Sequence, residues 1–304
     1  MELKLEALQT LVAVVEAGSL TAAARRLGVA KSVVSRRLSE LEQVVGAELV
    51  RRSTRHVRPT DAGLSLHARA RKVMSELETA VDEISGKDGS LKGALRVATP
   101  LTFGRLYLTG PLVAFAQANP EIELALDCDD RRGDIARGGY DLAIRIGRLT
   151  DSALLARKIA EAPGVMVASP TYLARRGSPK SLEDLSGHEC IGYANTPTTH
   201  RWPFKASGGG ERLVDVRPRV SVNSGEVIRE AAIAGLGLAV LPRFMVADVL
   251  ADGSLVNVLP KQPPMGGTIY ALRPPGTELS RKVRVLIDLL VEKVPPLLAA
   301  ADAL

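Results

Sequence analysis

The 304-residue chain has few of the side chains from which disulfide frameworks and metal centres are built. Its two cysteines, Cys128 and Cys190, are far apart in sequence, which excludes a disulfide framework and a metal-ligand spacing. The four histidines are scattered and form no zinc-type pair. We therefore expect no metal and no cofactor.

Long apolar runs are also missing. No run approaches the ~20 residues that a membrane-spanning helix needs. The first residues lack a charged segment followed by an apolar one, and Leu8, Leu11, Val12 and Val15 recur at helical spacing instead. The sequence thus predicts no signal peptide, no membrane partner and a cytoplasmic location.

Motifs for catalysis are missing as well. The chain contains no nucleophile elbow, no P-loop and no Ser-His-acid motif. The run "SGGGE" at 207–211 lacks the Lys-Ser/Thr ending of a phosphate loop, so a hairpin loop is the better interpretation. We therefore expect that the protein is not an enzyme.

Positive charge is concentrated near the N-terminus. The net charge of the whole chain is +6, and residues 25–58 alone hold nine Lys or Arg against three Glu. This segment therefore carries the whole net charge, which suits a polyanionic partner such as nucleic acid.

The segment "KSVVSRRLSELEQVVG" (31–46) has one apolar stripe and one face of hydroxyl and guanidinium groups. Val34, Leu38, Leu41 and Val45 are spaced as on one side of an α-helix. A shorter helix, "LTAAARRL", precedes it, with Ser19 as the expected N-cap and Gly28 as the stop. Two short helices joined by a tight glycine turn predict a helix-turn-helix whose basic face lies in a DNA major groove.

Two further elements follow this motif. The run "AELVRRSTRHVRPT" (47–60) reads as a basic hairpin wing, whose arginines would contact phosphates or the minor groove. Thr60 would then cap a long helix with an apolar heptad pattern. That pattern fits either a dimerising linker helix, which we favour, or a helix packed on its own domain; its dimerisation candidates are Leu66, Val73, Leu77 and Ile84.

The run "AGSLTAAARRLGVAKSVVSRRLSELEQVVGAELVRRSTRHVRPTDAG" (17–63) resembles the DNA-binding domain of LysR-type transcriptional regulators. Two departures, Val50-Arg51 in place of an aromatic and an acid and Pro59 in place of Leu, make the wing more basic. We expect Thr21, Arg52 and Arg55 to contact phosphates and Ser32, Ser35 and Arg36 to read base edges. The full set of expected DNA-binding residues is Thr21, Lys31, Ser32, Ser35, Arg36, Arg52 and Arg55.

From Ala94 onward, short apolar strands alternate with helical segments, which predicts parallel α/β sheets. The segments "LKGALRVATPLTFG", "YDLAIRIG" and "GLGLAVLP" resemble the effector domain of the same regulators, which is similar to periplasmic binding proteins. The resemblance implies two Rossmann-like α/β lobes, with the chain crossing between them near Ala168 and near Pro264. The expected division is a winged helix-turn-helix domain at 1–60, a linker helix at 60–88 and an effector domain at 92–304, with lobe I at 92–167 and 266–304 and lobe II at 168–265.

A ligand should sit beyond the carboxyl ends of the strands, between the lobes. Hydroxyls and helix N-termini there favour a small anionic metabolite. Thr99, Thr102 and Asn223 fit ligand contact or simple helix capping about equally well, and Tyr193 fits a core or cleft-wall position. The expected effector-binding residues are Thr99, Pro100, Thr102, Phe103, Ile146, Gly147, Tyr193, Asn195, Asn223 and Ser224.

These features together predict a sequence-specific DNA-binding transcriptional regulator switched by a small molecule. A pure solute-binding protein is the main alternative, but the basic N-terminal domain argues against it. The expected partners are double-stranded DNA, the effector, further copies of the chain as a dimer or tetramer, and RNA polymerase.

Overall fold

The structure, a computed structural model, describes residues 3–52, 57–85, 90–130, 135, 138–148, 154–196, 199–206, 208, 210–274 and 279–302. The chain divides into two compact units. The first comprises residues 1–90 with 134–140 and 274–281, and the second comprises 91–133, 141–273 and 282–304. No helix of the described residues is both long enough and apolar enough to cross a membrane.

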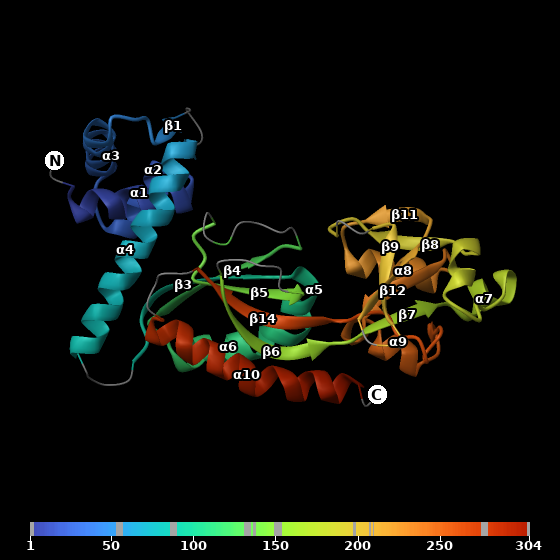
Figure 1. Ribbon diagram of the computed structural model, residues 1–304. Coiled ribbons are helices and arrows are strands. Elements are labelled where there is room, and N and C mark those ends of the chain that lie inside the picture. The colour runs from blue at the N-terminus through green and yellow to red at the C-terminus, as the bar shows by residue number, and fades with distance from the viewer. Residues whose placement is uncertain are drawn as a thin grey trace. The chain divides into compact units, whose positions relative to one another are not determined.

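The first unit is helical with a small hairpin (Figure 1). Its elements in chain order are α1 (Leu5–Ala17), α2 (Leu20–Leu27), α3 (Lys31–Val45), β1 (Val50–Arg52), β2 (Val57–Pro59) and α4 (Asp61–Ser85). Gly18 and Gly28 end α1 and α2 in the left-handed conformation, with φ of 59° and 64°. The Ser19 hydroxyl accepts from Ala22 N and the Thr60 hydroxyl accepts from Gly63 N, so both predicted caps are confirmed.

A single core holds these helices together. Small Ala23 and Ala24 on α2 are buried and let α1 and α2 approach closely. The apolar stripe of α3 points into the same core, and its fully or almost fully buried members are Val34, Leu38 and Leu41. The opposite face of α3 is thereby left to solvent.

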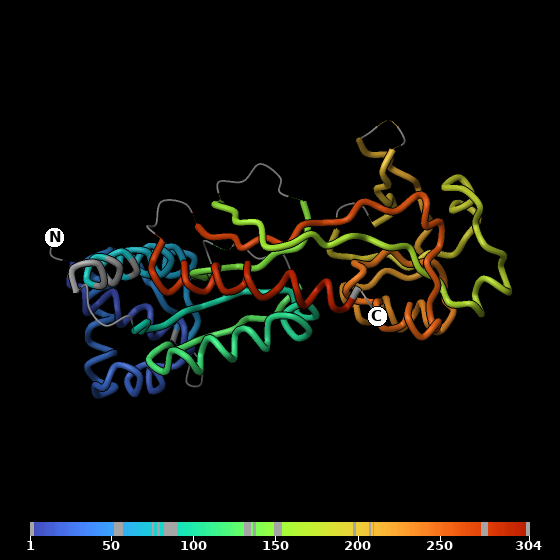
Figure 2. Tube along the Cα trace, turned by 90° about the horizontal axis from the view of Figure 1, so that it is seen from below, coloured from blue at the N-terminus to red at the C-terminus, as the bar shows by residue number. Residues whose placement is uncertain are grey.

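The second unit contains two five-stranded sheets. The first sheet has the order β4-β3-β5-β14-β6, built from β3 (Gly93–Thr99), β4 (Ile122–Cys128), β5 (Leu142–Gly147), β6 (Leu155–Ala162) and β14 (Gly267–Arg273). After β3 come α5 (Leu101–Phe103), a π-helical turn (Gly104–Leu108) and α6 (Thr109–Ala118). Helices α6 and α10 (Arg281–Asp302) run side by side along this sheet (Figure 2).

The second sheet has the order β11-β8-β12-β7-β13. Its strands are β7 (Gly164–Ala168), β8 (Cys190–Tyr193), β11 (Pro218–Val222), β12 (Leu238–Pro242) and β13 (Val256–Asn257). Helices α7 (Pro170–Arg176), α8 (Gly225–Ile233) and α9 (Ala247–Ala251) and two 3₁₀ turns (Glu183–Gly187, Arg243–Met245) accompany it. The predicted hairpin around "SGGGE" is present, since β9 (Arg201–Lys205) pairs antiparallel with β10 (Glu211–Asp215).

The predicted fold class is confirmed, with three differences in detail. Both sheets are mixed rather than parallel, because β14 and β7 each run antiparallel to their neighbours. The chain first passes between the sheets at Pro163, not near Ala168, since β6 pairs in the first sheet and β7 in the second. Proline has no N–H to donate to a ladder, so it can separate two strands of one extended run.

The third difference concerns the C-terminal helix. Two adjacent prolines ordinarily end a helix, but α10 continues through Pro295 and Pro296 to Asp302. Its apolar stripe continues as well, since Leu290 and Val294 are fully buried and Leu298 is almost so. Burial of this stripe offsets the backbone hydrogen bonds that the two prolines cannot make.

Candidate functional site

The exposed face of α3 carries the predicted recognition residues. Lys31, Ser32 and Arg36 are exposed, and Ser35 is half-buried between them. The Arg36 side chain is 69% exposed and lies 3.7 Å from Glu40 one turn later. Thr21 is exposed in the first turn of α2. Helix α3 therefore presents hydrogen-bond donors that can reach a DNA groove without breaking any contact in the core.

Two of the basic residues in the N-terminal cluster are already paired within the unit. Arg37 Nη2 lies 2.5 Å from Glu6 Oε2, and Arg26 Nη1 lies 2.5 Å from Glu16 Oε2. Both acids belong to α1. These two arginines therefore form ion pairs that connect α2 and α3 to α1. The net charge of the segment does not distinguish this structural role from contact with DNA.

The wing is anchored to α3 through Glu42. Its carboxylate accepts from Leu49 N at 2.9 Å and from Val50 N at 3.2 Å, at the start of β1. In the hairpin, Arg51 stands directly opposite Arg58, and both are exposed. Like charges opposite each other in a strand pair repel, and an anion bound between them would relieve that repulsion.

The remaining wing candidates cannot be placed in the same way. Arg55 and the Arg52 side chain lie outside the described residues, although Arg52 closes strand β1. Arg51 and Arg58 belong to the wing arginines that the sequence predicts to contact phosphates or the minor groove, and both are exposed.

Helix α4 packs on its own domain near its start and exposes apolar side chains further along. Near its start, Leu66 and Ala70 pack against the core of the first unit. Further along, Val73 and Leu77 are 49% and 47% exposed, and Val81 is 50% exposed. The Ile84 side chain lies outside the described residues. The second half of the helix thus shows solvent an apolar stripe that a partner could cover.

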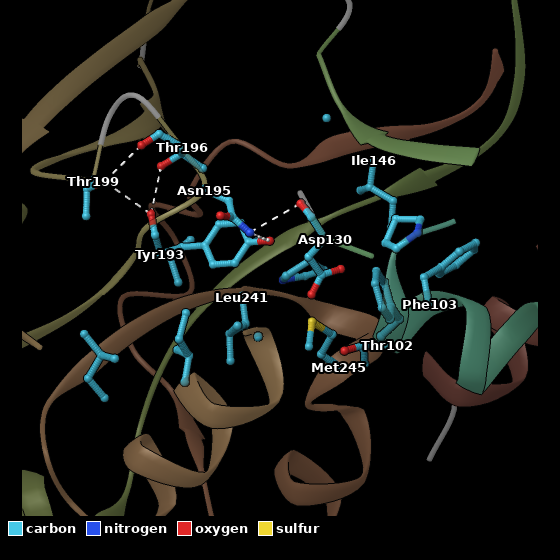
Figure 3. A pocket seen from close by; sticks show the side chains of 18 of the residues that line it. Thr102, Phe103, Asp130, Ile146, Tyr193, Asn195, Thr196, Thr199, Leu241 and Met245 are labelled. Carbon is cyan, nitrogen blue, oxygen red and sulfur yellow. Dashed lines mark hydrogen bonds between the residues drawn. The ribbon is translucent and has the colours of Figure 1, made fainter. Parts of the chain in front are cut away.

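The second unit contains a cavity of about 340 Å³ between its two sheets (Figure 3). One wall comes from the start of α5 and the end of β5, and the other from the loop after β8 and the start of α8. Apolar side chains form most of the lining, including Phe103, Trp202 and Met245. A volume of this size is within the range of small-molecule sites.

Seven of the ten expected effector residues line this cavity: Pro100, Thr102, Phe103, Ile146, Gly147, Tyr193 and Asn195. The other three do not. Thr99 is buried and donates to the Pro100 carbonyl, Ser224 caps α8 by accepting from Val227 N, and the Asn223 carbonyl accepts from Asn195 Nδ2. For Thr99 and Ser224, local structure accounts for the hydroxyl without a ligand.

Sequence reasoning missed the residues that reach the cavity from other segments. They come from the loop after β4, the start of β9, helix α8, the end of β12 and the 3₁₀ turn that follows β12. They include Asp129, Asp130, Arg201, Trp202, Ile228, Leu241 and Met245. Leu241 lies in the family-like segment "GLGLAVLP", but the other six residues carry no motif, and only the fold brings them together.

Asp130 occupies the helix N-terminus at which the sequence predicts an anionic ligand. Its Oδ1 accepts from Leu101 N at 3.0 Å, so the first amide of α5 already has a carboxylate partner. Burial raises the pKa of Asp130, as do the charges of Asp129 and Glu226, while the Leu101 amide and Arg145 oppose the rise. Asn195 Nδ2 donates to the Asp130 carbonyl at 3.3 Å, which links the two lobes in the cavity lining (Figure 3).

An aromatic cluster joins the lobes beside the cavity, which Phe103 and Phe244 line. The Phe103 and Phe244 ring centroids are 5.3 Å apart, and Tyr107 stacks on Phe103 at 5.6 Å. Tyr107 also donates from its hydroxyl to the Phe244 carbonyl at 3.1 Å. The π-helical turn brings Tyr107 to this position, and such turns often occur at functional sites.

Metal binding and cysteine chemistry have little support in the part of the chain that is described. No group of three or more His, Cys, Asp or Glu there could hold a metal ion. Both cysteines are free thiols, and burial raises the pKa of Cys190 to about 12. Among its described residues, the second unit therefore offers a binding cavity but no ready set of metal ligands.

Two family models match the chain. Residues 5–64 match the model of the bacterial regulatory helix-turn-helix protein, lysR family, and residues 88–295 match the LysR substrate binding domain. The chain is also 36% identical over 294 residues to the transcriptional regulator PtxR of Pseudomonas aeruginosa, which covers 95% of this chain and 93% of PtxR.

Solved structures agree. The LysR-type transcriptional regulator CrgA of Neisseria meningitidis is similar with a TM-score of 0.60 and 30% identity, over 96% of this chain and 99% of CrgA. The full-length Vibrio cholerae virulence activator AphB is similar with a TM-score of 0.60 and 28% identity, over 96% of this chain and 100% of AphB.

Proposed function

The chain belongs to the LysR family of DNA-binding transcriptional regulators, and from that premise we propose that it recognises a specific DNA sequence as a homo-oligomer and is switched by a small anionic effector. The family is one of regulators and not of enzymes. The proposed division follows the sequence analysis, with DNA binding at 1–60, a linker helix at 60–88 and effector binding at 92–304.

One observation carries the DNA-binding proposal: the first unit contains both the exposed polar face of α3 and the exposed basic hairpin β1–β2. Ser32, Ser35 and Arg36 face a major groove and read base edges, with Arg36 suited to guanine. Thr21, Lys31, Arg51 and Arg58 contact phosphates, because all four are exposed and Arg51 and Arg58 lie in register. Arg52 and Arg55 remain proposed phosphate contacts.

The exposed stripe on α4 supports a dimer. Pairing two such helices would cover Val73, Leu77 and Val81 and would place two winged domains on one DNA duplex. Half-sites would then be roughly palindromic and one or a few turns apart, at ~34 Å per turn. Assembly of dimers into a tetramer, contact with RNA polymerase and a cytoplasmic location belong to the same proposal.

The cavity supports an effector with an apolar body of ring size and polar groups at its ends. Phe103, Trp202 and Met245 would surround the body. An acidic group on the effector would pair with Arg145 or Arg201, or would take the place of the Asp130 carboxylate at Leu101 N. Because Asn195 bonds the backbone carbonyl of the same Asp130, an effector seated there would act beside this contact between the lobes and so favour one arrangement of them.

Calorimetric titration tests the effector proposal with a panel of small aromatic and aliphatic monocarboxylates, each beside its neutral amide. At least one carboxylate should bind about tenfold more tightly than its amide, which is the effect of one charge-assisted contact of ~1.4 kcal/mol. Binding of amides or amines with no carboxylate binding would contradict an anionic effector.

A matched pair of variants on α8 locates the site. Ile228 lines the cavity, whereas its neighbour Val227 is 51% exposed and does not. Ile228→Phe should fill part of the cavity and weaken carboxylate binding, while Val227→Phe should leave it unchanged. Equal binding by both variants would place the effector elsewhere.

A further inference from the structure

Glu16 forms a buried ionic cluster that joins three helices of the first unit. Its side chain is only 8% exposed, although it lies in the last turn of α1. Arg26 of α2 lies 2.5 Å from Oε2. His67 Nε2 and Arg71 Nη1, both from α4, each lie 3.6 Å from Oε1. One carboxylate is therefore shared by α1, α2 and α4.

This position is an unfavourable one for a lone carboxylate. The C-terminal end of a helix carries partial negative charge, and burial disfavours the ionised form. Burial would raise the pKa of Glu16, but His67, Arg71 and Arg26 together lower it to about 2. The carboxylate is thus kept ionised by partners that two other helices supply.

The cluster lies where α4 is attached to the DNA-binding helices. A side chain at Gly63 would collide with the Leu49 carbonyl, since its Cβ would be 1.9 Å away, so the start of α4 sits tightly on the chain just before the wing. His67 and Arg71 follow one and two turns later. By Val73 and Leu77 the helix faces solvent. The ionic cluster is therefore the last described polar attachment before the apolar stripe begins.

We infer that Glu16 is a positioning residue that sets the angle of α4 on the DNA-binding helices and thereby the spacing of the two half-sites. The inference rests on the proposed dimer through α4. From Arg71 to the end of α4 is about 21 Å at ~1.5 Å per residue, so a tilt of ~10° would move the helix end by roughly 4 Å. That shift would misplace the second recognition helix but leave each one intact.

The experiment uses the full chain and two DNA probes taken from its footprint, one holding a single half-site and one holding the pair. Glu16→Gln keeps the shape of the side chain and removes its charge. We expect half-site affinity to stay within twofold of wild type while affinity for the paired site falls about tenfold or more. We also expect the preferred spacing, scanned in single base-pair steps, to shift or broaden.

Two further variants separate positioning from general stability. Arg71→Lys keeps the positive charge beside Glu16 and should retain paired-site binding, whereas Arg71→Met should lose it. Glu76→Gln removes an exposed pair with Lys72 on the same helix and should change neither affinity. Circular dichroism checks that each variant is folded.

The possible outcomes separate the inference from its premise. Equal losses at the half-site and the paired site in Glu16→Gln would mean a merely structural role and would overturn the inference. A retained paired-site preference with unchanged spacing would also overturn it. A wild-type chain that does not prefer the paired site would contradict the proposed dimeric recognition and, with it, the inference.

Discussion

Arg36 is the side chain on which the proposed recognition of DNA bases depends most. It is largely exposed on α3, and among the described residues its ion pair with Glu40 is a loose one, so its guanidinium can reach a base edge. Arg36→Ala should weaken specific binding by ~1–3 kcal/mol and relax the base preference at one position. Competition binding with single-base variants of the site measures this.

The matched control is Arg157→Ala, which removes an exposed arginine from β6 of the second unit and should have no effect. Uniform weakening on all sequences in Arg36→Ala would make Arg36 a phosphate contact rather than a base reader.

Glu16 also gives a prediction for pH. Its folded pKa of about 2 is below the unfolded value near 4.5, so its ionised form stabilises the folded chain above pH 4.5. That contribution is lost as pH falls from about 4.5 toward 2. Urea unfolding of the wild type and Glu16→Gln should therefore differ at pH 7 and converge in this window. A difference that persists unchanged at pH 3 would contradict the ionic account.

Single residues were predictable where their role is local and unpredictable where it depends on distant segments. Ser19, Gly28 and Thr60 follow from capping chemistry, and each ends or begins a helix where the sequence predicts it. Arg37 and Asp130 are different, because one pairs with Glu6 and the other reaches the amide of Leu101 across the fold. No sequence spacing encodes those contacts.

At the scale of elements, α4 gives the clearest test. Leu77→Lys would place a charge in the exposed apolar stripe and should dissociate the dimer, since a buried unpaired charge is costly. Sedimentation velocity measures the change in mass. Ser65→Lys, which adds the same charge at an exposed position near the start of α4, should leave the mass unchanged. An unchanged mass in Leu77→Lys would exclude this stripe as the dimer contact.

Helix α10 offers a second test at this scale. Pro296 is exposed inside the helix and cannot donate a hydrogen bond to the preceding turn. Pro296→Ala should restore that bond and raise the stability by about 1 kcal/mol, or ~2–4 °C in melting temperature. Leu297→Ala, at an exposed neighbour, should change little. A lower melting temperature in Pro296→Ala would mean that the proline is needed for packing.

Most helices and strands were predictable from periodicity, and the errors have a common physical origin. The run from Leu155 to Ala168 is uniformly extended in character, so nothing local except Pro163 signals that it belongs to two sheets. The antiparallel course of β14 and β7 is likewise set by pairing with strands far away in sequence. Strand direction is a property of the assembled sheet and not of the strand.

At the scale of the whole molecule, the two units divide binding of DNA and binding of a small molecule between them. The uneven charge along the sequence predicts a separate DNA-binding unit, because residues 25–58 hold the entire net charge. The cavity could be anticipated only in part, since seven predicted residues line it but many of its walls come from segments without motifs. An uneven charge distribution can be read from the sequence alone, whereas the lining of a cavity can be identified only once the fold is known.

Footprinting of the purified protein on DNA around its own gene, across a salt series, tests the central claim most directly. The account predicts a paired, roughly palindromic footprint whose affinity falls about 10³-fold or more between 50 and 200 mM salt, as six or more phosphate contacts require. Weak protection with no sequence preference would contradict it, because exposed arginines alone would then account for all of the DNA binding.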